Sequence, residues 1–231
     1  MGTFRKILFP VDYSEPCKAI VPCIQDIVRH YSAELSLVHA CGPEALSFID
    51  LPVATTTFSE DSRAFEDKRL AKFALEWFPG QTVESITELT DPATAIHKVM
   101  QDRGSDLVML PTHGRGPLRR LLFGSVTAKV LHDVDVSVWT GTGFALTGHK
   151  PRVPYETIIC ALSGSDEDKT LLREAHAFAA SYQAQLSLLR VVEIPRSIMD
   201  IDCTPFVRQS HGCGGSPATG AKEHTGNRCT T

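Results

Sequence analysis

Glycines and hydroxyl residues that could bind an anion gather in the stretch 108–130, VMLPTHGRGPLRRLLFGSVTAKV. Nine residues separate Gly114 from Gly124, and Ser125 and Thr127 follow the second glycine at the start of an amphipathic segment. The backbone N–H groups of a glycine loop and of a helix's first turn lack helical partners and lie at the positive end of the helix dipole. Glycine also lets the main chain approach a ligand closely, and hydroxyl groups add donors. This stretch therefore predicts a phosphate-binding loop that leads into a helix.

The arginines of the same loop have two interpretations. Arg115, Arg119 and Arg120 lie between the two glycines, where they could add positive charge for a phosphate. Arginines on a loop are, however, usually solvated surface residues, and many strand-to-helix turns carry one or two glycines without binding a ligand. The combination of glycine spacing, hydroxyl pair and positive charge favours the phosphate interpretation.

Apolar periodicity alternates between strand and helix along the N-terminal part of the chain. Such alternation produces right-handed crossovers and a parallel sheet with helices on both faces. We therefore predict an α/β, doubly wound, Rossmann-like domain with a five-stranded parallel sheet. The expected strands cover residues 4–11, 33–40, 82–89, 106–110 and 134–140, and the expected helices cover 14–31, 59–78, 92–103 and a stretch that begins at 124.

Three loops at the carboxyl ends of strands carry the candidate binding residues. Ligands of doubly wound sheets bind beyond these ends, where the strand order reverses. The loops after the first, second and fourth strands contain Pro10–Asp12, Ala40–Cys41 and the glycine loop, so we expect them to form one site. Asp12 could also be a turn residue ahead of a helix that begins near Ser14, but its position at the ligand-binding edge favours a binding role. His113 has no sequence neighbour that suits acid or base catalysis, and we expect no catalytic residue.

The glycine spacing resembles the signature of the universal stress protein family, in which Gly, two residues, Gly, nine residues and Gly are followed by Ser or Thr. The resemblance covers residues 4–140 and includes Pro10-Val11-Asp12 after the first strand. It implies a fold like the adenine nucleotide alpha hydrolases, with ATP, with or without Mg²⁺, as the ligand. Asp12 and the backbone at Ala40 would contact adenine, Leu110 would pack on the base or ribose, and the glycine loop would hold the phosphates. The nucleotide-binding residues implied by the resemblance are Pro10, Val11, Asp12, Ala40, Leu110, Gly114, Arg115, Gly124, Ser125, Val126 and Thr127.

One position departs from the family signature. Counting back from Gly114, the first glycine of the signature falls on Pro111, which has no N–H group to donate and fixes φ near its own preferred value. This departure favours a second hypothesis, in which the chain is a universal stress protein that mediates interaction and dimerisation without a nucleotide.

A second copy of the fold begins after the first domain. With an offset of 151 residues, the segment 33–37 (AELSL) aligns without a gap on 184–188 (AQLSL). The copy has only a strand, a helix and a strand, since too few residues follow for a glycine loop and three more strands, and Ser163 stands in the place of Asp12. We expect a universal stress protein domain with the nucleotide site at 1–145, a truncated second repeat at 155–195 and a disordered tail at 202–231.

Cysteine and histidine recur in this tail, which is rich in Gly, Thr and Ser. Their spacings match no standard zinc finger, so we expect no metal site. The seven cysteines of the whole chain include no Cys-x-x-Cys pair and fit reduced thiols. The tail residues considered as zinc ligands are Cys203, His211, Cys213, His224 and Cys229.

Composition excludes several classes of partner. The chain of 231 residues is 42% hydrophobic, with a net charge of -4 and a pI of about 6.1, which fits a globular protein without a nucleic-acid partner. No apolar segment is long enough to span a membrane, and the N-terminus lacks the layout of a signal peptide. We expect a cytoplasmic protein with no membrane partner.

These features together predict a universal stress protein that binds ATP in its first domain and acts in stress response through nucleotide-dependent interaction. The sequence names no water-activating base, so we expect at most slow ATP hydrolysis; an adenylating enzyme of the wider superfamily would need a further substrate domain. The fifth strand would be an unpaired edge in a lone chain. We therefore expect a homodimer that pairs residues 136–140 of two copies about a two-fold axis.

Overall fold

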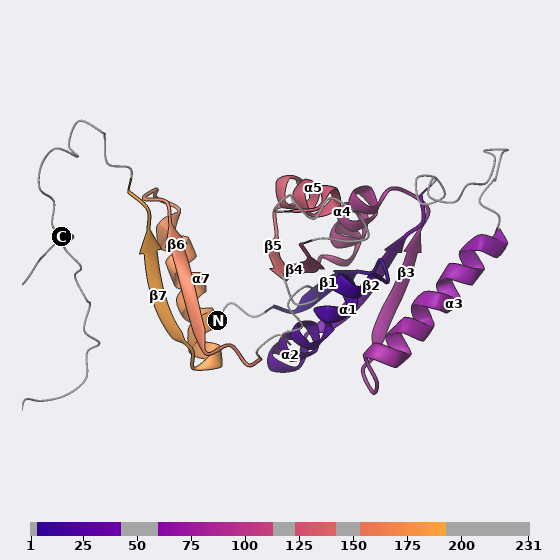
Figure 1. The fold of residues 1–231 in the computed structure, drawn as a ribbon, viewed down its shortest axis with the longest axis horizontal. Coiled ribbons are helices and arrows are strands. Elements are labelled where there is room, and N and C mark those ends of the chain that lie inside the picture. The colour runs from indigo at the N-terminus through magenta and orange to yellow at the C-terminus, as the bar shows by residue number, and fades with distance from the viewer. Residues whose placement is uncertain (1–3, 43–59, 113–122, 142–152, 193–231) are drawn as a thin grey trace, which may run out of the picture. The chain divides into compact units, whose positions relative to one another are not determined.

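The computed structural model describes residues 4–42, 60–112, 123–141 and 153–192, with the side chains of 60–62 excepted (Figure 1). Residues 1–190 belong to one compact unit. The predicted tail at 202–231 and the loop residues 113–122, which include Gly114 and Arg115, lie outside the described residues. No helix in the described ranges is both long and apolar enough to cross a membrane.

A five-stranded sheet forms the centre of the first domain, and every pair of neighbouring strands in it is parallel. The strand order is β3-β2-β1-β4-β5, so the predicted doubly wound sheet is confirmed. The chain moves outward from β1 to β3 and then returns to β4, which places the reversal of strand order between β1 and β4. The strands are β1 (Lys6–Pro10), β2 (Glu34–Ala40), β3 (Val83–Glu88), β4 (Leu107–Pro111) and β5 (Ser137–Gly141).

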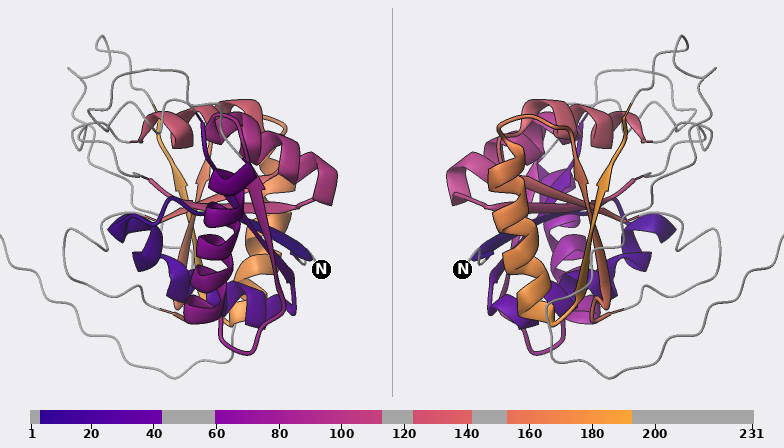
Figure 2. Two further views of the ribbon diagram at one scale, coloured as in Figure 1. Left: turned by 90° about the vertical axis from the view of Figure 1, so that its right-hand side faces the viewer. Right: turned by 90° about the vertical axis from the view of Figure 1, so that its left-hand side faces the viewer.

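Helices cover both faces of this sheet (Figure 2). Successive strand residues point to opposite faces, so Ile7 and Phe9 of β1 lie in one core cluster and Leu8 lies in the other. The cluster of Ile7 contains side chains of α1 (Glu15–Ala19), α2 (Val21–Tyr31) and α3 (Glu60–Trp77). The cluster of Leu8 contains side chains of α4 (Pro92–Arg103) and α5 (Ser125–Asp133).

Helix boundaries follow capping residues that are visible in the sequence. Asp91 accepts a hydrogen bond from the backbone N of Thr94 at 3.2 Å, and Gly104 ends α4 in the left-handed conformation. The single helix predicted for 14–31 is wrong, because α1 and α2 are separated at Ile20. Pro22 explains the interruption, since its ring has no N–H to donate and collides with the preceding turn of a continuous helix.

A strand, a helix and a strand follow the first domain and form a two-stranded parallel sheet. Residues of β6 and β7 pair in the same register as those of β1 and β2, since Lys6 faces Glu34 and, 151 residues later, Thr157 faces Gln185. The helices that precede β2 and β7 also end alike. Their C-cap residues are both left-handed, with φ of 52° at Ser32 and 55° at Gln183. The elements are β6 (Thr157–Leu162), α7 (Asp168–Tyr182) and β7 (Gln185–Arg190).

Candidate functional site

The glycine loop begins and ends at the carboxyl end of β4. Thr112 continues the pairing with β5 through a hydrogen bond from its backbone N to the Gly141 carbonyl at 3.0 Å. The carbonyl of Thr112 in turn accepts from the backbone N of Gly124 at 2.7 Å. This bond fixes the N-terminus of α5 beside the reversal of strand order, where ligands of such sheets bind.

The first turn of α5 carries main-chain donors that have no acceptor within the helix. Gly124 is the N-cap, with φ −67° and ψ 160° and no side-chain cap. The first helical bond runs from the N of Ala128 to the carbonyl of Gly124 at 2.9 Å, so the N–H groups of Ser125, Val126 and Thr127 precede the helical ladder. Ser125 is exposed. The arrangement suits an anion, because these donors lie at the positive end of the helix dipole.

Thr127 uses its hydroxyl group differently from the sequence prediction. The side chain is 3% exposed, and its hydroxyl donates to the carbonyl of Pro111 at 3.0 Å. A hydroxyl has one proton to donate, so in this geometry the proton ties α5 to β4 and does not point to a phosphate. Pro111 itself is the last residue of β4, where it lies opposite Gly141 and where the lack of an N–H is tolerated.

Asp12 lies in the turn after β1 and acts there as a turn residue. Its Oδ1 accepts from the backbone N of Ser14 at 3.0 Å and from the Ser14 hydroxyl at 2.6 Å. A carboxylate can accept about four hydrogen bonds, so this role is compatible with a further contact to a ligand. Tyr13 has φ 61°, a left-handed conformation that bulky residues rarely adopt, and it reverses the chain directly after Asp12.

The remaining predicted contact residues flank these turns. Val11 continues the pairing of β1 with β2, because its backbone N donates a hydrogen bond to the Val38 carbonyl at 2.8 Å. Val11 and Leu110 are each 3% exposed, so little of their side-chain surface is available to a ligand. Pro10 and Ala40 are half-buried at the ends of β1 and β2. The structure thus brings the described members of the predicted site to one edge of the sheet.

Cys17 lies against the Asp12 turn and is buried. Burial, and to a smaller extent the negative charge of Asp12, raises the pKa of its thiol to about 12. Because the thiolate and not the thiol is nucleophilic, Cys17 is a poor candidate for covalent chemistry at this site.

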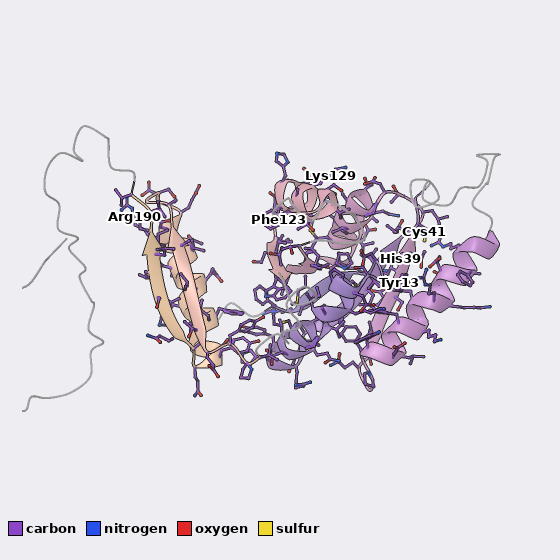
Figure 3. The ribbon with its side chains drawn as sticks, in the orientation of Figure 1. Tyr13, His39, Cys41, Phe123, Lys129 and Arg190 are labelled. Atoms are coloured by element: carbon purple, nitrogen blue, oxygen red, sulfur yellow. The ribbon has the colours of Figure 1, made fainter. Side chains whose placement is uncertain are left out.

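Side chains outside the predicted set of nucleotide-binding residues lie at the same edge, on the face that α3 covers. His39 lies in β2 and Cys41 directly follows that strand (Figure 3). Glu66 belongs to α3. The His-x-Cys spacing on a strand could have indicated that both residues share a face. Nothing in the sequence indicated Glu66, because its position depends on how α3 packs on the sheet.

Comparisons with known proteins concern mainly the first domain. A model of the universal stress protein family matches residues 3–140. The universal stress protein MJ0577 of Methanocaldococcus jannaschii is 24% identical over 143 residues, which cover 55% of this chain and 88% of that protein. The solved structure of MJ0577 aligns with a TM-score of 0.50 at 21% identity and covers 60% of this chain and 95% of its own.

Two further solved structures differ in how much of the chain they match. A universal stress protein from Archaeoglobus fulgidus DSM 4304 aligns with a TM-score of 0.62 at 18% identity over 85% of this chain and 70% of its own, which extends the likeness in fold beyond the first domain. A universal stress protein solved in complex with cAMP aligns with a TM-score of 0.44 at 18% identity over 61% of this chain and 98% of its own.

Proposed function

Because the chain belongs to the universal stress protein family, we propose that its first domain, residues 1–145, binds ATP and acts in a cytoplasmic stress response through nucleotide-dependent interaction. The observation that carries this proposal is the hydrogen bond from Gly124 N to Thr112 O. That bond holds the positive end of α5 at the reversal of strand order, where a phosphate group would meet main-chain donors.

Each part of the nucleotide has a proposed partner. The backbone N–H groups at the start of α5 bind phosphate, together with Gly114 and Arg115 of the loop. The Asp12 carboxylate and the backbone of Ala40 bind adenine. The phosphate-binding residues on α5 are Gly124, Ser125, Val126 and Thr127. The floor beneath the base and ribose is formed by Pro10, Val11 and Leu110.

The proposed role is binding, with ATP hydrolysis at most slow. The thiol of Cys17 stays protonated and Asp12 already accepts two hydrogen bonds from Ser14. Neither group is set up as a nucleophile or as a base for water. Mg²⁺ would accompany the ATP phosphates as their counterion.

A second candidate function is interaction without a nucleotide, and Pro111 favours it. The residue cannot donate the main-chain hydrogen bond that glycine would offer at that position. Both candidates include a homodimer through β5, which lies at the edge of the described sheet. Val138 and Trp139 of that strand are half-buried, and pairing of two β5 strands would cover them further.

We also propose that residues 155–195 are an incomplete second repeat. The shared register of β1–β2 and β6–β7 at an offset of 151 residues supports this. A matching main-chain hydrogen bond at the start of the second strand also supports the repeat. Glu34 N donates to Arg5 O at 2.8 Å, and Gln185 N donates to Glu156 O at 2.9 Å. The repeat would not bind a nucleotide, because Ser163 replaces Asp12.

The phosphate assignment is tested with Gly124→Val. The φ and ψ of Gly124 lie in the extended region that any residue adopts, so valine is compatible with the backbone while its branches enter the space in front of the first turn. We expect loss of ATP binding with an unchanged circular dichroism spectrum and a slightly lower melting temperature, because valine is a poorer N-cap than glycine. Ala128→Val is the matched control, since it adds a similar side chain at an exposed position one turn later. Equal ATP affinity in Gly124→Val and the parent protein would refute the assignment.

A further inference from the structure

Three side chains with metal-binding atoms converge on the α3 face of the sheet. Residues two apart on a strand share a face, so His39 and Cys41 follow Leu37 of β2 toward α3. Glu66 precedes the buried Leu70 by one turn of α3 and therefore shares its inner side. The imidazole nitrogen, the thiol sulfur and the carboxylate oxygen all lie within 4.8 Å of one another.

Burial distinguishes this cluster from an ordinary group of surface side chains. His39 is 7% exposed and Cys41 is 5% exposed, while the Glu66 side chain retains 18% of its exposure. The main chain fixes Cys41, because its N donates to the Glu88 carbonyl at 2.8 Å and so continues the pairing of β2 with β3. An ion could reach the cluster past Glu66, its most exposed member.

A hydrogen bond to the main chain sets the tautomer of His39. Its Nδ1 lies 2.6 Å from the carbonyl oxygen of Val11, and because a carbonyl only accepts, Nδ1 must carry the proton. In the neutral ring the lone pair is then on Nε2, which lies 3.5 Å from Oε2 of Glu66. A cation between these two electron-rich atoms, either a proton or a metal ion, would make their contact favourable. Histidines that bind metals typically donate their other N–H to a carbonyl in this way.

Neighbouring side chains hold the cluster in place. Nη1 of Arg69 contacts both oxygens of the Glu66 carboxylate, at 3.4 and 3.5 Å. The Arg69 guanidinium also lies over the ring of Tyr13, 3.9 Å from its centre. The Tyr13 ring packs against the His39 ring, with 4.7 Å between their centres. Such contacts orient metal ligands, and Figure 3 shows Tyr13, His39 and Cys41 beside α3.

We propose that His39, Cys41 and Glu66 bind a divalent transition-metal ion, with Zn²⁺ as the best fit. An imidazole, a thiolate and a carboxylate are the ligands that Zn²⁺ prefers, whereas Mg²⁺ and Ca²⁺ bind oxygen. Tetrahedral Zn²⁺ with a nitrogen at about 2.0 Å and a sulfur at about 2.3 Å separates these two atoms by about 3.5 Å. Since the ligand atoms lie within 4.8 Å of one another, the cluster closes around the ion by about 1.3 Å or less, with water as the fourth ligand. On binding, the Cys41 thiol loses its proton to solvent.

This metal site uses different atoms from the proposed nucleotide site, although the two sites are adjacent at the end of β2. Its ligands are side chains on the α3 face, whereas the nucleotide proposal uses the backbone of Ala40 and the first turn of α5. The metal experiment is therefore done without nucleotide, so that loss of one activity is distinguishable from loss of the other.

Cobalt spectroscopy tests the proposal on the full chain, reduced and freed of metal by chelation. We expect one equivalent of Co²⁺ to produce a sulfur-to-cobalt charge-transfer band that Zn²⁺ then abolishes. Cys41→Ser should remove the band, and Glu66→Gln should weaken Co²⁺ binding by at least about tenfold. Cys160→Ser is the matched control, since Cys160 is a buried cysteine of β6 outside the cluster. If Cys41→Ser fails to fold, Glu66→Gln decides, because its side chain is partly exposed and isosteric.

The tail contributes its own cysteines, and a triple variant separates them from the cluster. With Cys203, Cys213 and Cys229 changed to serine, the band should persist. The proposal is overturned if this triple variant loses the band while Cys41→Ser keeps it, or if the parent protein gives no band with excess Co²⁺. In that last case the cation between His39 and Glu66 is a proton, and the pair is an ordinary buried ion pair.

Discussion

Replacing Thr127 with valine removes one hydroxyl group and preserves the shape of the side chain. In the structure that hydroxyl donates to the Pro111 carbonyl at 3.0 Å from a position that is 3% exposed. The variant therefore loses the side-chain bond between α5 and β4 and leaves the carbonyl of a buried strand end without that donor. Its backbone N–H, the proposed phosphate donor, is unchanged.

The expected cost follows from burial. A hydrogen bond contributes about 1 kcal/mol net, and a buried acceptor that loses its donor costs about 1–3 kcal/mol. For a chain of this size each kcal/mol lowers the melting temperature by roughly 2–4 °C. Thr127→Ser keeps the hydroxyl and removes only a methyl group, which costs about 0.8 kcal/mol. We expect the valine variant to be the less stable of the two.

Thermal unfolding and ATP titration of both variants distinguish a structural hydroxyl from a ligand-binding one. We expect Thr127→Val to unfold at a lower temperature and, below that temperature, to bind ATP within about threefold of the parent, since a threefold change is less than about 1 kcal/mol. A valine variant with the parent's melting temperature and a tenfold or greater loss of ATP affinity would refute this reasoning. The hydroxyl would then bind phosphate, as the sequence alone predicts.

Three further predictions concern the base, the dimer and the buried thiols. Asp12→Ala should weaken binding of ATP more than binding of inorganic triphosphate, because the carboxylate contacts adenine; equal losses would assign Asp12 to a metal or to the turn alone. Val138→Pro should convert a dimer to a monomer in light scattering by removing a ladder donor, whereas a parent mass near 25.3 kDa would contradict the dimer. Burial raises the thiol pKa of Cys17 to about 12 and that of Cys23 to about 11, so both stay protonated at pH 8. Iodoacetamide should label them only after unfolding, and rapid labelling of the folded chain would show the shifts to be wrong.

Local signals predicted most of the fold. The helix at 92–103 is confirmed to the residue, because Asp91, Pro92 and Gly104 each act on the backbone close to their own position. The fifth strand is shorter than predicted and begins at Ser137. Val134 is the C-cap of α5, and its N donates to the Val130 carbonyl at 3.1 Å. Hydrophobic periodicity could not reveal this boundary, because valines suit the end of a helix and a strand alike.

Contacts between distant segments were not predictable from the sequence. The glycine spacing indicated where α5 begins, but not that the Thr127 hydroxyl reaches the Pro111 carbonyl, which depends on how closely α5 packs on β4. Likewise, Glu66 reaches His39 only because of the position of α3 along the sheet. Side-chain chemistry was therefore visible in the sequence where it lies within one loop, and hidden where two elements meet.

Titration of the full chain with ATP at equilibrium tests the central claim most directly. The account predicts saturable binding of one ATP per chain with a dissociation constant in the micromolar range, about −8 kcal/mol. It also predicts that Gly124→Val abolishes this binding and that Ala128→Val preserves it. Absence of saturable binding to the folded parent protein at millimolar ATP would contradict the account and favour the interaction protein that Pro111 suggests.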